Sequence, residues 1–93
     1  MFVGVLEVSL LMRGSHSLKD KRRVVRSIKD RVRARLNASI AEVGDPDLHQ
    51  RADLAAVTVS GDRMRAEAVL NDVLKIIDHA RGAERFETRL EIH

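Results

Sequence analysis

The chain has 93 residues and a formal net charge of +3 at pH 7, with 44% hydrophobic and 33% charged residues. This length supports one hydrophobic core, and the composition is that of a folded protein rather than a disordered one. Cysteine is absent, which excludes disulfides, thiolate metal sites and iron–sulfur clusters. No stretch has the length of a membrane span or the features of a signal peptide, so we expect one cytoplasmic domain over residues 1–93 with no membrane partner.

The first predicted element is a strand over Phe2–Met12. Its apolar residues recur at every second position, while Glu7 and Ser9 fall on the other side, as in a half-buried strand. The residues expected to face the core are Phe2, Leu6, Val8, Leu10 and Met12.

A helix is predicted over residues 18–36. Ser17 is a suitable N-cap, and Asp20, three residues later, favours the positive end of the helix dipole. Residues 17–36 hold nine Lys or Arg and two Asp, a local net charge of +7 against −4 for the rest of the chain. Apolar residues at helical spacing form one core-facing stripe. They are Leu18, Val25, Ile28, Val32 and Leu36.

The later segments are predicted, in order, as a strand over 38–43, a single helical turn over 47–51, a strand over 54–60, a helix over 63–79 and a strand over 85–93. The turn at 44–46 and Gly82, after the second helix, provide the stops. The last strand alternates strictly, which would turn Phe86 toward the core with Thr88, Leu90 and Ile92.

This order is βαββαβ. Right-handed crossovers in the two split βαβ units place both helices on one face of a four-stranded antiparallel sheet. The predicted fold class is therefore α+β, with a ferredoxin-like arrangement.

Three stretches of the chain resemble the YlxP-like family of short bacterial proteins. They are the motif H-S-L-K-x-K-R over residues 16–22, directly before the first helix, the motif N-x-S-x-A-E over 37–42, and the segment 47–52. His49 is a departure, because members of that family carry a tryptophan there. The resemblance implies a ferredoxin-like fold and a gene neighbourhood among bacterial translation and ribosome-maturation factors. It implies no established activity, because the function of the family is unknown.

The main candidate site is a row of cations on one flank of the first helix. Its predicted members are Lys19, Arg22, Arg23, Arg26, Lys29 and Arg33. Such a row could hold the phosphates of structured RNA or of a ribosomal subunit. The chain lacks Trp and Tyr, so base stacking is not expected and binding through the backbone or the shape of the RNA remains. The alternative interpretation is a solvated face in which Asp20 and Asp30 pair with neighbouring cations.

Other chemistries have weaker support. His16 and Ser17 precede the helix N-terminus and form a candidate anion site. The four histidines lack the spacing of metal ligands, so neither a metal nor a cofactor is expected. We predict a protein that is not an enzyme. One alternative is a homodimeric adaptor that uses the open sheet face, where Val3, Val5 and Leu11 fall. A third is an acylphosphatase-like hydrolase, for which the phosphate-cradling loop is missing.

Overall fold

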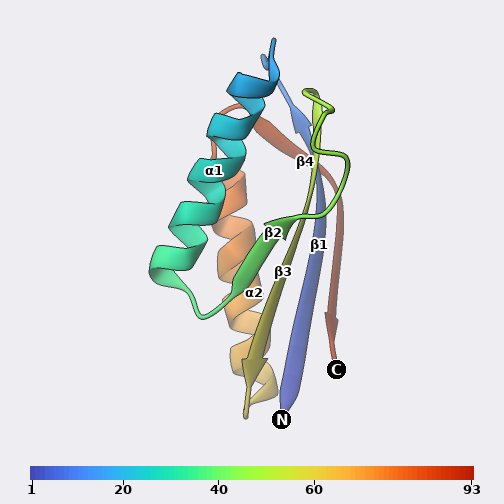
Figure 1. Ribbon diagram of the computed structural model, residues 1–93. Helices are drawn as coiled ribbons and strands as arrows, with labels where there is room; N and C mark the ends of the chain where they lie inside the picture. The colour runs from blue at the N-terminus through green and yellow to red at the C-terminus, as the bar shows by residue number, and fades with distance from the viewer.

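The computed structural model describes residues 1–93 and contains four strands and two helices. The elements are, in order, β1 (Phe2–Met12), α1 (Leu18–Arg35), β2 (Ser39–Glu42), β3 (Arg51–Ser60), α2 (Arg63–His79) and β4 (Ala83–Ile92). The strands form one sheet in the order β2-β3-β1-β4, with antiparallel neighbours throughout. Both helices cover the same face and run antiparallel to each other (Figure 1). The predicted ferredoxin-like fold is confirmed.

The core lies between the sheet and the two helices. Alternate residues of β1 and β3 face the helices because side chains of a strand point to opposite sides in turn. α1 buries Val25, Ile28 and Val32 of its predicted stripe, and α2 buries apolar residues at the same helical spacing, namely Ala66, Leu70, Val73 and Ile77. The largest apolar residues of this core are Leu6, Leu10, Ile28, Leu54, Leu70 and Ile77, each no more than 2% exposed. Phe2, Leu18 and Leu36, which were expected to face the core, are only half-buried.

Each helix begins at a side-chain cap. Ser17 Oγ accepts the N–H of Asp20 at 3.2 Å, and Asp20 Oδ2 accepts the N–H of His16 at 3.2 Å. This reciprocal arrangement satisfies two donors that the start of α1 would otherwise leave free. Asp62 Oδ1 accepts the N–H of Met64 at 3.0 Å and caps α2 in the same way. After α2, Gly82 takes a positive φ of 85° to turn the chain into β4.

Phe86 does not face the core, so its predicted placement was wrong. In the pairing of β1 with β4, Ser9 lies opposite Glu87 and Leu10 lies opposite Arg85, so Phe86 is an extra residue in β4. Such a bulge breaks the alternation of the strand. Phe86 is 47% exposed, and the guanidinium carbon of Arg51 lies 5.1 Å from the centre of its ring.

The predicted helical turn over residues 47–51 is also wrong. The chain forms turns and bends between β2 and β3, and β3 begins already at Arg51. Asp45 Oδ1 accepts the N–H of Asp47 at 2.9 Å, a side-chain turn that competes with helix formation. The carbonyl oxygen of Pro46, which a helix starting at residue 47 would need, accepts a hydrogen bond from Lys21 Nζ instead, and the carbonyl oxygen of Asp45 accepts from both Lys21 Nζ and the N–H of Leu48.

Candidate functional site

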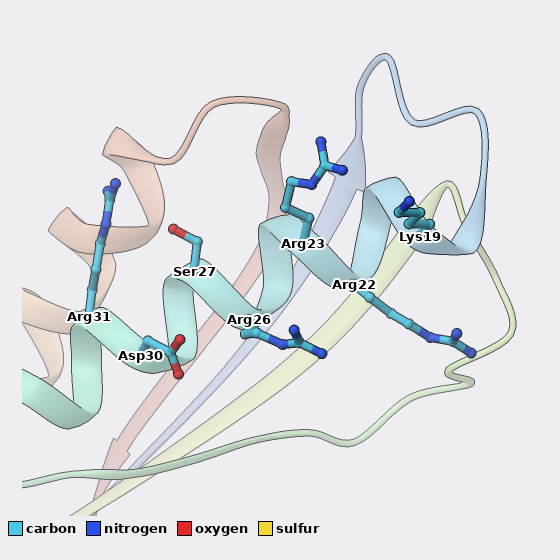
Figure 2. A pocket seen from close by; sticks show the side chains of 7 residues that line it. All are labelled: Lys19, Arg22, Arg23, Arg26, Ser27, Asp30 and Arg31. Atoms are coloured by element: carbon cyan, nitrogen blue, oxygen red, sulfur yellow. The ribbon is translucent and has the colours of Figure 1, made fainter.

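The outer surface of α1 carries a concavity between its own side chains. The residues that line it are Lys19, Arg22, Arg23, Arg26, Ser27, Asp30 and Arg31. Figure 2 shows Arg23 and Arg31 extending from one side of the helix, and Arg22 and Arg26 from the other. Five of the seven side chains are cationic and none is hydrophobic. The surface is therefore suited to an extended anion rather than to an apolar ligand.

The structure brings together four of the six predicted cations, Lys19, Arg22, Arg23 and Arg26. Lys29 and Arg33 do not line the concavity. Lys29 is half-buried, and Arg33 Nη2 donates to the carbonyl oxygen of Ile40 in β2 at 3.1 Å. Sequence reasoning missed Arg31, although its position four residues after Ser27 and eight after Arg23 places the three on one side of a helix.

None of the cations of this surface forms an ion pair, although the Asp30 carboxylate also lines it. No carboxylate oxygen lies within 4.0 Å of Lys19, Arg22, Arg23, Arg26 or Arg31. Asp20 is engaged in capping the helix, and Asp30 forms no ion pair. The pairs between these acids and neighbouring cations, expected for a merely solvated face, are absent. Like charges three and four residues apart instead repel each other by about 0.2–0.5 kcal/mol per pair.

Four of the seven arginines outside α1 form ion pairs, whereas Arg63, Arg65 and Arg81 do not. Arg13 contacts Glu84, Arg51 contacts Asp53, Arg85 contacts Asp78 and Arg89 contacts Glu91. The open face of the sheet, on the side away from the helices, holds two of these pairs among its exposed valines, Val57 and Val59. The unpaired charge is thus concentrated on α1.

Lys21 lies on the opposite side of α1 and is only 1% exposed. Its Nζ is 2.7 Å from Glu42 Oε2 and donates to the carbonyl oxygens of Asp45 and Pro46 at 3.3 Å each. All three ammonium protons thus have an acceptor within reach. Lys21 belongs to the H-S-L-K-x-K-R motif and Glu42 ends the N-x-S-x-A-E motif. The pair joins the two motifs and fixes the beginning of α1, and with it the basic surface, to β2 and the following loop.

Sequence reasoning missed the role of Lys21, yet a signal was present. Lys21 lies four residues before Val25 and seven before Ile28, which places it within the apolar stripe of the predicted helix. A cation at such a position needs a partner. Glu42, at the end of the next strand, was available as that partner.

The candidate anion site at His16 and Ser17 is already occupied by groups of the chain itself. The Ser17 hydroxyl and the Asp20 carboxylate accept the backbone N–H groups of Asp20 and His16. An external anion would have to compete with Asp20, and the site stays a prediction.

No group of three or more His, Asp or Glu residues is placed so that it could hold a metal ion. Neither helix has the length and hydrophobicity of a membrane-spanning segment.

Residues 3–90 match a protein family described as "Protein of unknown function (DUF503)". The chain belongs to this family. It is 37% identical over 89 residues to the "Uncharacterized protein YlxP" of Bacillus subtilis (strain 168), a match that covers 96% of this chain and 97% of the relative. The resemblance noted from the motifs is therefore confirmed. The family is one of unknown function, and neither description names a ligand or a reaction.

Two solved structures share the fold. A de novo designed protein with a ferredoxin fold, LFR1 1, superposes with a TM-score of 0.58 at 14% identity and covers 100% of this chain and 84% of its own. The designed protein Foldit4 gives a TM-score of 0.54, also at 14% identity, over 100% and 97% of the two chains. At this identity the likeness shows the fold alone.

Proposed function

We propose that this protein is a non-catalytic, cytoplasmic accessory factor that binds structured RNA or a ribosomal particle through the outer surface of α1. The observation that carries this proposal is the set of five cations that line one surface without a carboxylate within 4.0 Å of any of them. Phosphate groups would supply the missing counter-charges and release bound ions from the RNA.

The dimensions of the surface suit a nucleic-acid backbone. Lys19 and Arg31 are twelve residues apart on one continuous helix, which corresponds to about 18 Å at 1.5 Å per residue. This length spans several phosphates, whereas a single small anion would contact only one or two of the cations. The lining includes no aromatic residue, so the proposed contacts are to the backbone rather than to stacked bases.

The first experiment is co-sedimentation of the protein with ribosomal subunits, followed by binding to a structured RNA fragment at several salt concentrations. The double variant Arg22→Gln/Arg26→Gln should lower the slope of log K against log salt by about 1.4–1.8, since each lost phosphate contact contributes about 0.7–0.9. Glutamine is nearly as good a helix former as arginine, so the helix should persist.

The matched control is Arg63→Gln/Arg65→Gln. These arginines also lie exposed on a helix without an ion pair, and α2 begins at the end of the molecule opposite to the start of α1 (Figure 1). The control removes the same net charge and should change the slope little. An equal loss in both variants would indicate diffuse attraction to a basic protein. Absence of RNA binding by the parent at physiological salt would contradict the proposal and favour the homodimeric adaptor.

A further inference from the structure

A second concavity adjoins the one in Figure 2 and extends it from α1 to the end of α2. Arg23, Ser27 and Arg31 line both concavities. The other residues of the second concavity are Val24, His79, Ala80 and Arg81. The basic surface therefore does not end at the edge of α1 but continues to the turn between α2 and β4.

The fold holds this turn against α1. The N–H of Ala80 donates to the carbonyl oxygen of Ile77 at 3.1 Å and closes α2, and Gly82 then reverses the chain with its positive φ. A Cβ placed on Gly82 would lie 3.7 Å from Val24 Cγ2 of α1, so the two segments are in close contact. Arg81 is thus presented beside α1 by a short, fixed turn.

Arg81 forms no ion pair, like the five cations that line the first concavity. Asp78, the acid in the last turn of α2, is engaged by Arg85, with Arg85 Nε 2.6 Å from Oδ1 and Nη2 2.9 Å from Oδ2. No carboxylate lies within 4.0 Å of Arg81. Asp78 therefore does not neutralise the second concavity.

The free cations consequently form two groups. Arg22 and Arg26 extend from one side of α1, whereas Arg23 and Arg31 extend from the other (Figure 2), where Arg81 joins them across the second concavity. A single nucleic-acid strand that runs along Arg22 and Arg26 would bring no phosphates to the group on the other side of the helix. A duplex presents two backbones, one to each group.

We infer that the ligand of this surface is double-stranded RNA, and that Arg31 and Arg81 contact the second of its two backbones. The inference rests on the proposed function and specifies its ligand. Proteins that bind single strands supply aromatic platforms for the bases, and this surface has none. Phe86 lies on the open face of the sheet against Arg51, and Phe2 is half-buried in β1. Double-stranded RNA is recognised mainly by its shape and its phosphates, for which cations on rigid helices suffice.

The test compares an RNA hairpin with a stem of about 16 base pairs, the span of known duplex-binding domains, with an unstructured RNA of the same number of nucleotides. The parent should bind the hairpin at least tenfold more tightly. Arg31→Gln/Arg81→Gln should lower the salt slope for the hairpin by about 1.4–1.8 and leave the slope for the single strand nearly unchanged. The control remains Arg63→Gln/Arg65→Gln, which should alter neither slope.

Equal affinity of the parent for the two RNAs would overturn the inference. The inference would also be overturned if Arg31→Gln/Arg81→Gln and the control Arg63→Gln/Arg65→Gln had the same salt slope for binding to the hairpin. Thermal melting would show that both variants are folded. If Arg22→Gln/Arg26→Gln nevertheless weakens binding to the hairpin, the proposed function stands while the duplex assignment fails. A parent that binds neither RNA overturns both.

Discussion

The inner surface of α1, which packs on the sheet, and its outer surface, which faces solvent, both carry cations. The cations of the two surfaces differ in burial and in whether the chain supplies their partners. Lys21 on the inner surface is 1% exposed and has three oxygen acceptors. Arg22, the next residue, is exposed on the outer surface and has none. The inner cation contributes to folding because all of its partners belong to the chain. The outer cations have no carboxylate partner within the chain, and under the proposed function the phosphates of RNA would supply one.

Desolvation explains this difference. A buried ammonium group without partners costs several kcal/mol, so the fold must supply the partners of Lys21. An exposed guanidinium keeps its water, and folding requires no partner for it. Repulsion between neighbouring outer cations costs only about 0.2–0.5 kcal/mol per pair, which a stable domain tolerates. Changes on the inner surface should therefore alter stability, and changes on the outer surface should alter binding.

The largest effect is expected from a charge placed on the inner surface. Ile28 is 0% exposed in the core, and Ile28→Asp would put a carboxylate there without a partner. The free energy of unfolding should fall by about 4 kcal/mol or more, enough to unfold a domain of ordinary stability. Urea denaturation followed by circular dichroism measures this loss. The control Ile28→Val should lose only about 0.5–1.5 kcal/mol; a parent-like midpoint for Ile28→Asp would show that the inner surface is assigned wrongly.

Removal of the inner cation should have the next largest effect. Lys21→Met leaves the Glu42 carboxylate and the Pro46 carbonyl oxygen without their donor, while the Asp45 carbonyl oxygen keeps the N–H of Leu48. The free energy of unfolding should fall by about 3 kcal/mol, at the lower end for a broken buried pair because 18% of the Glu42 side chain is exposed. The double variant Lys21→Met/Glu42→Leu should recover part of this loss because it leaves no unpaired carboxylate. The same denaturation experiment decides: a double variant no more stable than Lys21→Met would show that the ion pair is not the cause.

On the outer surface, one substitution should move stability and binding in opposite directions. Arg22→Glu would place an acid three residues after Lys19 and four before Arg26, in the first part of the helix. Stability should rise by about 0.5 kcal/mol, whereas RNA binding should weaken more than in Arg22→Gln. Thermal melting and RNA titration of the two variants at one salt concentration test this. Loss of stability in Arg22→Glu would mean that Arg22 has a structural role.

The smallest effect concerns the ion pair between Arg51 and Asp53 on the open face of the sheet. Hydrogen bonds from Arg51 and then Ser9 hold the pKa of Asp53 below its ordinary value of 3.8. A lowered pKa means that ionised Asp53 stabilises the fold above pH 3.8 and that this contribution is lost as the pH falls through the lower, folded-state value. Asp53→Asn should therefore melt slightly below the parent at pH 7, and the difference should shrink below pH 3.8. A difference that is constant with pH would exclude the ion pair as its source.

Much of the fold could be predicted because periodic apolar residues and helix caps are local signals. Val25, Ile28 and Val32 define the inner surface of α1 by spacing alone, and Ser17 marks its start. Phe86 could not be placed, because a bulge depends on the register between strands far apart in the sequence. The segment before β3 was mispredicted for a related reason, since its conformation depends on Lys21, more than twenty residues away.

The candidate site was predicted in part for the same reasons. Charge density located the outer surface of α1, and spacing gave Arg22 and Arg26. The contribution of Arg81 depends on how α2 packs beside α1, which periodicity does not report. Arg33 was included because its spacing fits the row, yet its guanidinium reaches the Ile40 carbonyl of the neighbouring strand.

The burial of Lys21 also affects the reactivity of its amine. The chain has four lysines, Lys19, Lys21, Lys29 and Lys75, and only Lys21 is fully buried. An amine-reactive reagent such as an acetylating agent should modify the other three in the folded protein and reach Lys21 only when the domain opens. The rate of modification at Lys21 relative to the exposed lysines, read by mass spectrometry of the peptide that contains it, would therefore report how often the domain opens around this side chain.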